Sequence, residues 1–195
     1  HPDFAYTMTE GNLAEYLREY IAGRYQELNI QGYSMEADIP EENIRTAFDH
    51  HQLNRVWENI ISNSVKYTPK GTTLFVRLMK SADGKNIIIH IGDNGPGIPR
   101  SDRKRIFEIF YQTDNSRGGT GIGLPLAKLL AEKHGGRLYL DEQTQKTTFI
   151  IHIPLLQENT QEDDQVKLEL LTSPVSDTGK ELQTLEGKGS YSILL

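Results

Sequence analysis

Hydrophobic residues recur every three or four positions in two long segments of the N-terminal part, which predicts two amphipathic helices. The first covers residues 12–28. The second opens at Asp49, where a carboxylate suits a helix N-cap and Gln52, three residues on, suits the reciprocal partner of a capping box. It ends at the Pro-Lys-Gly run of residues 69–71. The stripe that we expect this helix to bury consists of Leu53, Trp57, Ile60, Ile61 and Ser64.

The chain between these two helices is polar and is expected to be irregular. Beyond them, short apolar or alternating runs predict strands, which we place at residues 72–80, 86–91, 137–140 and 147–153. A hairpin signal, Ala-Asp-Gly-Lys at residues 82–85, joins the first two strands. Residues 103–110 resemble a short helix, and residues 124–134 a longer one that stops at two glycines. This order predicts an α+β fold, a two-layer α/β sandwich with a mixed, mostly antiparallel sheet and helices on one face.

The composition changes after Leu156. Hydrophobic residues make up 36% of the chain, which is low for one domain packed from end to end and favours a domain of residues 1–156 with a tail. Residues 157–190 carry eight acidic and three basic residues, and so most of the net charge of −6, which predicts an acidic linker. Residues 191–195, Tyr-Ser-Ile-Leu-Leu, are apolar and β-prone, which makes them a candidate first strand of a truncated further domain.

Charge and residue usage exclude several classes of function. Neither part of the chain offers the basic surface that nucleic-acid binding needs, so we expect no nucleic-acid partner. The chain contains no cysteine, which excludes a disulfide framework and a thiolate metal site. No apolar run approaches the roughly 20 residues of a membrane span.

Polar side chains form one face of the second helix, beside its apolar stripe. Asn59, Asn63, Lys66 and Tyr67 fall within an arc of about 100° at helical spacing. Amide oxygens suit Mg²⁺ that is charge-balanced by phosphates, and a lysine on the same side can neutralise phosphate oxygens. A single asparagine more often caps or solvates a helix, but the lysine reverses that preference here. Taken alone, Tyr67 is a core residue rather than a cover for an adenine ring.

Two glycine-rich segments follow. Asp93 ends an apolar strand and opens the run Asp-Asn-Gly-Pro-Gly-Ile. Its carboxylate either forms a turn or accepts a hydrogen bond from the exocyclic amine of adenine, and Gly95 and Gly97 let the chain pass close to the base. Residues 119–124, Gly-Thr-Gly-Ile-Gly-Leu, lead into a helix whose N-terminus favours phosphate. This second run is neither a Walker loop nor a Rossmann fingerprint, and a purely structural glycine loop remains the alternative.

These motifs, in this order, resemble those of the ATP-binding catalytic domain of sensor histidine kinases. That domain belongs to the GHKL superfamily, which includes gyrase, a heat-shock chaperone and MutL. The motifs are an asparagine box at residues 59–67, a first glycine box at 93–98, a phenylalanine box at 107–110 and a second glycine box at 119–124. The Lys66-Tyr67 pair and the phenylalanine box favour the kinase branch. The resemblance covers residues from about 5 to 155 and implies the Bergerat ATP-binding fold, with ATP and Mg²⁺ as ligands.

The resemblance also implies a role for each matching residue. Asn59 and Asn63 hold Mg²⁺, and Lys66 contacts the phosphates. Tyr67 lies against adenine, whose amine Asp93 reads.

Further assignments concern the neighbouring segments. Thr148 matches a threonine near the base, and residues 111–118 match a mobile lid. Gln112 stands where many members carry an arginine, so we expect Arg117 to take over that phosphate contact. The full expected nucleotide-binding set is Asn59, Asn63, Lys66, Tyr67, Asp93, Gly95, Gly97, Ile98, Phe110, Arg117, Gly119, Thr120, Gly121, Ile122, Gly123, Leu124 and Thr148.

The activity that this resemblance implies is that of a protein-histidine kinase, which donates the γ-phosphoryl group of ATP to a histidine. None of the six histidines is followed by the family's acceptor motif, so we expect the acceptor on a separate dimerisation domain of the same protein. No catalytic base is expected, because phosphoryl transfer depends mainly on positioning and charge. Residues 191–195 resemble the first strand of a response-regulator receiver domain, which implies a hybrid kinase. The implied parent is a homodimer in the bacterial inner membrane, with this domain in the cytoplasm.

The alternative is an ATPase that acts as a nucleotide-driven conformational switch. Such relatives usually place an acidic residue four positions before the Mg²⁺-binding asparagine, and that position is Asn59 here. Glu58 is adjacent but lies about 100° around the helix, which favours the kinase.

Overall fold

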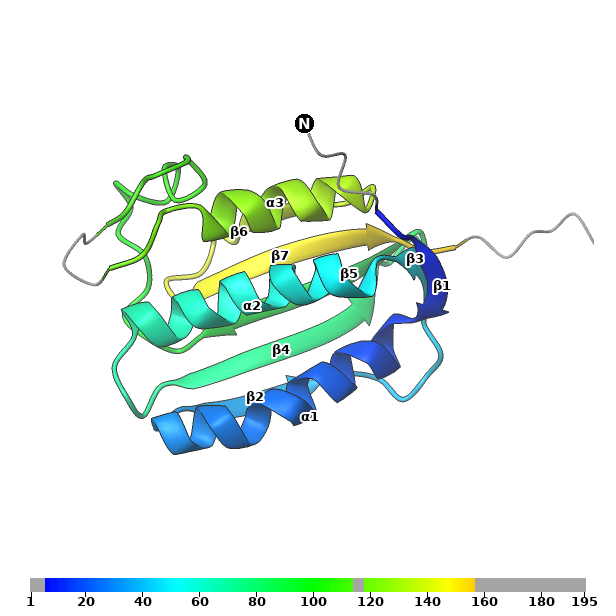
Figure 1. Ribbon diagram of the computed structural model, residues 1–195, viewed down its shortest axis with the longest axis horizontal. Coiled ribbons are helices and arrows are strands. Elements are labelled where there is room, and N and C mark those ends of the chain that lie inside the picture. The colour runs from blue at the N-terminus through cyan, green and yellow to red at the C-terminus, as the bar shows by residue number, and fades with distance from the viewer. Residues whose placement is uncertain (1–5, 114–117, 157–195) are drawn as a thin grey trace, which may run out of the picture. The chain divides into compact units, whose positions relative to one another are not determined.

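The structure, a computed structural model, describes residues 6–113 and 118–156. In this part of the chain three helices lie on one face of a five-stranded sheet (Figure 1), as the predicted α+β sandwich requires. The helices are α1 (Leu13–Gln31), α2 (His50–Tyr67) and α3 (Gly123–Lys133). The strands are β1 (Thr9–Asn12), β2 (Ser34–Asp38), β3 (Arg45–Phe48), β4 (Thr73–Lys80), β5 (Asn86–Asp93), β6 (Arg137–Leu140) and β7 (Thr147–Pro154). The predictions for residues 157–190 and 191–195 lie outside the described residues.

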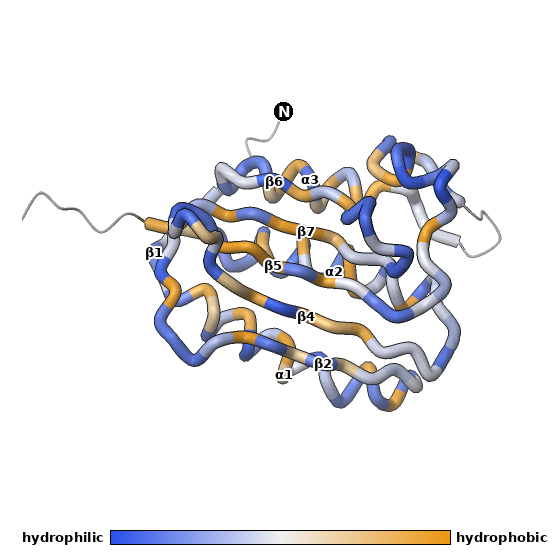
Figure 2. Tube along the Cα trace, turned by 180° about the vertical axis from the view of Figure 1, so that it is seen from behind, coloured by the Kyte–Doolittle hydropathy of each residue, from blue (hydrophilic) through white to orange (hydrophobic). Residues whose placement is uncertain are grey.

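The main sheet has the strand order β2-β4-β5-β7-β6. β2 runs parallel to β4 and every other pair is antiparallel, so the sheet is mixed and mostly antiparallel, as predicted. The predicted hairpin joins β4 to β5 through Gly84, whose φ of 66° a glycine adopts without strain. Seen from behind, the strands lie in front of all three helices (Figure 2), so no described helix covers that face of the sheet. β1 and β3 form a separate two-stranded ribbon.

The segment between the first two helices was expected to be irregular, and that expectation is wrong. It contains β2 and β3. β2 is an edge strand of five residues, Ser-Met-Glu-Ala-Asp, which alternates polar and apolar positions but has only two apolar residues and buries only Met35. β3 has only four residues and pairs with β1, which is equally short. Short edge and ribbon strands carry too few buried positions for their period to be read from sequence.

The start of α2 confirms one half of its predicted cap and corrects the other. The Asp49 carboxylate accepts a hydrogen bond from the Gln52 backbone N–H at 3.0 Å, as an N-cap does. The Gln52 side chain does not return the bond, because it accepts from Arg55 at 3.1 Å. The Asp49 N–H donates instead to Nε2 of His134 at 3.1 Å, so the end of α3 is tied to the start of α2.

Residues 103–110 were predicted to be a short helix but form consecutive turns. The N–H groups of Arg105 and Glu108 bond to carbonyls three residues back, at 2.8 Å in both cases. Phe110 then has a φ of 65°, which is a left-handed backbone conformation that ends any helical path. This irregular path brings the next residues back toward α2.

The core lies between the helices and the covered face of the sheet. All five predicted stripe residues of α2 are buried, with Ile60 and Trp57 at 0% exposure. Alternate residues of β5 and β7 face them, including Ile89 and Phe149, which are also at 0%. None of the helices in the described ranges is both long and apolar enough to cross a membrane. The same packing fixes α2 against the sheet at the point where its polar residues begin.

Truncating a stripe residue should destabilise the fold. We expect Ile60→Ala to lower the free energy of unfolding by about 2–5 kcal/mol, because a cavity is left in a packed core. The control is Ile30→Ala, since Ile30 is 87% exposed and its truncation should change stability by less than about 0.5 kcal/mol. Urea unfolding followed by circular dichroism measures both. Equal effects of the two substitutions would contradict this account of the core.

Candidate functional site

Two adjoining cavities lie beside the C-terminal half of α2. One has a volume of about 220 Å³ and includes Asp93 and Gly97 in its lining. The other, of about 210 Å³, includes Asn59 and Gly119. They share part of their lining, namely Asn63, Tyr67, Ile106, Tyr111, Gln112 and Leu124. The polar helix face and the two glycine-rich segments therefore surround one hollow with two ends.

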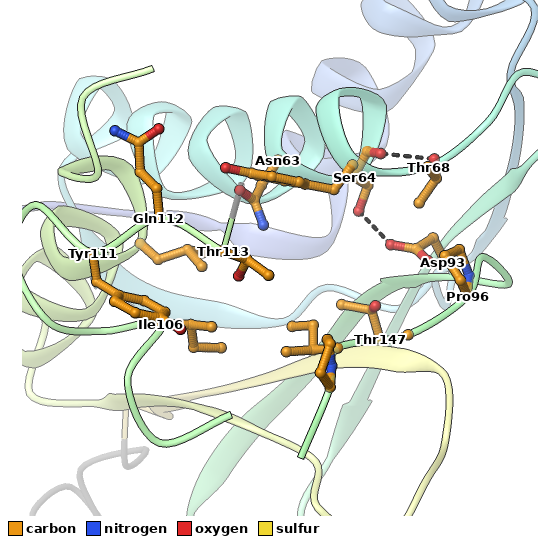
Figure 3. A pocket seen from close by; sticks show the side chains of 15 residues that line it. Asn63, Ser64, Thr68, Asp93, Pro96, Ile106, Tyr111, Gln112, Thr113 and Thr147 are labelled. Atoms are coloured by element: carbon orange, nitrogen blue, oxygen red, sulfur yellow. Dashed lines mark hydrogen bonds between the residues drawn. The ribbon is translucent and has the colours of Figure 1, made fainter. Parts of the chain in front are cut away.

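The first end is built around a buried carboxylate. Asp93 is the last residue of β5 and is 1% exposed. The Ser64 hydroxyl donates to its Oδ2 at 2.7 Å and the Gly95 N–H donates to its Oδ1 at 3.0 Å. Figure 3 shows Ser64 reaching down from α2 to this carboxylate, with Thr147 beside it. These partners are all neutral, so the carboxylate is not part of an ion pair with them.

The environment of Asp93 acts on its protonation. Burial raises the pKa of the Asp93 carboxyl above its ordinary value, and hydrogen bonds from Ser64, Gly95 and Thr147 act in the opposite direction. The carboxylate keeps free acceptor capacity toward the cavity, because each oxygen can accept more than one hydrogen bond. A neutral donor group, such as an aromatic amine, suits it.

The first glycine run serves the protein's own packing. A Cβ on Gly95 would lie 2.6 Å from Cγ2 of Thr68 and 2.9 Å from Oδ1 of Asp93. Gly97 has a φ of 81°, and a Cβ there would lie 2.2 Å from the Gln145 carbonyl oxygen. These contacts give both glycines a packing role, and Gly97 also lines the cavity, so the expectation that they let the chain pass close to a base stays a prediction. They let the turn close over α2 on one side and over the β6–β7 connection on the other.

The second end joins side chains of α2 to the second glycine run. A Cβ on Gly119 would lie 2.3 Å from Nζ of Lys66, and a Cβ on Gly123 would lie 3.1 Å from Oδ1 of Asn59. Gly119 also has a φ of 116°, which side-chain-bearing residues rarely adopt. The Lys66 ammonium lies 4.7 Å from the centre of the Tyr67 ring. The loop thus packs against two of the four α2 side chains that the sequence singled out, Asn59 and Lys66.

The helix that follows this loop has no side-chain cap from its N-cap residue. α3 begins at Gly123, one residue earlier than predicted, and its N-cap Ile122 makes no side-chain hydrogen bond to the first turn. Gly123 and Leu124 line the second end of the hollow. The first N–H groups of a helix lack partners within the helix, and they favour an anion.

The donor set for a metal ion is limited. In the described part of the chain no group of three or more His, Cys, Asp or Glu residues could hold a metal. The amides of Asn59 and Asn63 line the second end of the hollow one helical turn apart. Two neutral oxygen donors suit Mg²⁺ only when phosphates complete its ligands and balance its charge. The residues present therefore fit Mg²⁺ that arrives with a polyphosphate.

Some predicted site residues do not line the hollow. Thr148 faces a different cavity on the other side of β7, and Thr147 takes its place, because side chains alternate along a strand. The side chain of Phe110 is 73% exposed, and Ile122 is 39% exposed. Arg117 lies outside the described residues.

Other lining residues were not in the expected nucleotide-binding set, although Tyr111, Gln112 and Thr113 belong to the segment that was matched to a lid. They are Ser64, Thr68, Pro96, Pro99, Ile106, Tyr111, Gln112, Thr113, Pro125 and Thr147, together with Ser62. Ser64 had been assigned to the core stripe, and a hydroxyl within an apolar stripe was a signal that it has a polar partner. Tyr111 and Gln112 follow the left-handed turn at Phe110, which the sequence did not reveal.

Comparison with known proteins gives a consistent match. Residues 48–157 match the family described as histidine kinase-, DNA gyrase B-, and HSP90-like ATPase. The chain is 32% identical over 149 residues to the sensor histidine kinase WalK of Bacillus subtilis, covering 74% of this chain and 24% of WalK. It is 29% identical over 184 residues to histidine kinase P4 of Formosa agariphila, covering 90% of this chain and 13% of that protein. The chain thus spans about a quarter or less of these two relatives.

Solved structures show the same fold. The catalytic domain of histidine kinase ThkA superposes with a TM-score of 0.66 at 23% identity, covering 76% of this chain and 97% of that one. ThkA in complex with the response regulator protein TrrA gives a TM-score of 0.63 at 21% identity, covering 76% of this chain and 42% of that one.

The raised pKa of Asp93 can be tested by titration. Because burial raises the pKa of Asp93, its side-chain carbon signal in NMR should titrate above the ordinary value of 3.8. Ser64→Ala removes a hydrogen bond to the charged form and should raise the pKa further. Asp83 is an internal control, because hydrogen bonds from Ser81 and the Lys85 N–H lower its pKa.

Stability should follow the same titration. Between pH 3.8 and the raised pKa of Asp93, the folded chain binds more protons than the unfolded chain. The contribution of this group to the free energy of unfolding is thus present below pH 3.8 and is lost as the pH rises through the raised pKa. Asp93→Asn should abolish this dependence. A midpoint for Asp93 at or below that of Asp83 would contradict the description of the site.

Proposed function

The chain belongs to the family of histidine kinase-, DNA gyrase B- and HSP90-like ATPases and is of the sensor histidine kinase type, and we propose that it binds ATP with Mg²⁺ and phosphorylates a histidine outside its own catalytic domain. The observation that carries the proposal is the two-ended hollow, with a buried acceptor at one end and an amide and glycine-loop surface at the other. A nucleoside triphosphate has the matching polarity, a base at one end and phosphates at the other. The whole parent protein's activity and partners are part of the same proposal.

The base end favours adenine. The Asp93 carboxylate is a hydrogen-bond acceptor, and the bonds from Ser64 and Gly95 use only part of its acceptor capacity. Adenine presents an exocyclic amine, which can donate to the remaining acceptor capacity. Guanine or hypoxanthine presents a carbonyl oxygen at the same position, and two facing acceptors repel each other. Tyr67 and Ile98 supply side-chain surface beside the base.

The phosphate end supplies charge and backbone donors. The proposal places Lys66 and the first N–H groups of α3 on phosphate oxygens, with the amides of Asn59 and Asn63 as ligands of Mg²⁺. When bound, ATP would supply the phosphoryl group and Mg²⁺ would neutralise charge on the phosphate oxygens. The chain's own residues hold the triphosphate in one orientation and leave its end accessible. No general base is assigned, because such a transfer depends mainly on positioning.

The phosphate acceptor is proposed to be a histidine of a separate dimerisation domain in the same protein. Of the five histidines within the described ranges, none lines either end of the hollow. His134 is 6% exposed and both of its ring nitrogens are engaged, by the Asp49 N–H and the Leu130 carbonyl. Exposed apolar side chains beside the phosphate end offer a docking surface for such a domain, namely Ile109, Phe110 and Ile122.

The wider assembly is likewise proposed. A response-regulator receiver domain is the onward partner, as ThkA has TrrA, and residues 191–195 would begin one in the same chain. The parent protein would be a homodimer in the bacterial inner membrane, with this domain in the cytoplasm.

The conformational-switch alternative needs an acidic residue that activates water. Glu58 is the nearest acid in sequence, but the Tyr20 hydroxyl donates to it at 2.8 Å and Arg24 at 3.2 Å. Both partners lie on α1, away from the hollow, and Glu58 lines neither end. This placement favours the kinase.

Nucleotide binding tests the first part of the proposal. Isothermal titration calorimetry should give a dissociation constant for ATP in the micromolar range with Mg²⁺ and much weaker binding without it. Asp93→Asn should weaken binding by about 10- to 150-fold, which corresponds to losing a hydrogen bond to a charged group. Asp83→Asn, in the exposed β4–β5 turn, is the matched control and should bind as the unaltered chain does. Unchanged affinity in Asp93→Asn would overturn the role of this carboxylate.

Phosphoryl transfer tests the second part. Incubated alone with Mg·ATP, the chain should acquire negligible acid-labile phosphate, because no described histidine reaches the hollow. Adding the parent protein's dimerisation domain should produce acid-labile phosphate on that domain, and Asn63→Ala should abolish it. Phosphohistidine that accumulates on the isolated chain would show that the acceptor lies within it.

A further inference from the structure

Gln112 has a carboxamide of which only one half is engaged. Its Nε2 donates to the Gly119 carbonyl at 3.1 Å. Its Oε1 is buried and has no hydrogen-bond partner in the described part of the chain. Because the Gly119 group is a carbonyl and can only accept, the nitrogen must face it, which fixes the orientation of the amide. The group left over is therefore an acceptor.

A buried acceptor without a donor costs free energy, and native proteins leave few of them. The engaged Nε2 explains why Gln112 cannot simply turn to satisfy its oxygen, since turning would set two carbonyl oxygens against each other. A donor supplied by a ligand accounts for the arrangement. Oε1 can only accept, and an ionised phosphate oxygen also only accepts, so a phosphate oxygen does not suit this atom.

The position of Gln112 indicates which part of a ligand supplies that donor. It is one of the six residues that line both ends of the hollow. Asp93 marks the base end and Asn59 the phosphate end. In a nucleotide the sugar joins the base to the phosphates, and its 2′ and 3′ hydroxyl groups are hydrogen-bond donors. Figure 3 shows Gln112 next to Tyr111 at the side of the cavity away from Asp93.

We propose that Oε1 of Gln112 accepts a hydrogen bond from a ribose hydroxyl of the bound nucleotide. Gln112 is then a specificity-determining residue that favours ribonucleotides over deoxyribonucleotides. It also links the sugar to the second glycine run, because the same carboxamide holds Gly119. This inference rests on the proposed binding of ATP.

The test compares the affinities of ATP, 2′-deoxyATP and 3′-deoxyATP by calorimetry in the presence of Mg²⁺. The unaltered chain should bind one of the two deoxynucleotides about 2- to 12-fold more weakly than ATP, the net effect of one hydrogen bond. Gln112→Met has nearly the same size but no acceptor, so it should bind all three with equal affinity. Gln112→Lys keeps a donor for the Gly119 carbonyl without an acceptor, and it should also lose the discrimination. Circular dichroism checks that each variant is folded.

The matched control is Gln143→Met, because Gln143 is exposed on the β6–β7 connection and lines neither end of the hollow. It should keep the discrimination of the unaltered chain. If ATP binds but Gln112→Met and the unaltered chain show the same ratio of affinities, the assignment of Gln112 fails and the proposed function stands. If none of the three nucleotides binds, the proposed function fails, and the assignment of Gln112, which depends on it, fails as well.

Discussion

The constraint on which the site depends is a carboxylate buried among neutral donors. Asp93 closes β5, and Ser64 and Gly95 bind it from α2 and from the turn that follows the strand. One side chain thus fixes the distance between the helix layer, the sheet and the first glycine turn. A salt bridge would have satisfied the charge but consumed the acceptor capacity. Neutral donors hold the carboxylate in place and leave it able to accept from a ligand, at a cost to the stability of the empty domain.

Helix α2 carries both ends of the hollow, so its packing determines their separation. Ser64 faces the base end, and Asn59 lies five residues earlier at the phosphate end, which is about 7.5 Å along a helix axis. The second glycine run closes against Asn59 and Lys66 so tightly that a side chain at Gly119 would displace the ammonium. Both glycine runs are therefore explained first by contacts within the protein. The hollow that remains is a consequence of those contacts.

The sequence predicted the elements with strong periodicity and the residues with distinctive chemistry. The stripe of α2, the β4–β5 hairpin and the polar face from Asn59 to Tyr67 could be read because each has several repeating positions. β2 could not be predicted, because an edge strand buries a single residue. Thr147 lines the hollow and the predicted Thr148 lines a cavity on the other face, because in a strand one residue selects the opposite face. The positions of Tyr111 and Gln112 depend on the left-handed turn at Phe110, which no local sequence pattern predicts.

The most direct test is a crystal structure of the chain with Mg²⁺ and a non-hydrolysable ATP analogue. The account predicts one nucleotide across both ends of the hollow. Its exocyclic amine should lie within hydrogen-bond distance of Asp93, and its phosphates should lie between Asn63 and the glycine run of residues 119–123. A nucleotide bound elsewhere, or with its base at the glycine run and its phosphates at Asp93, would contradict it.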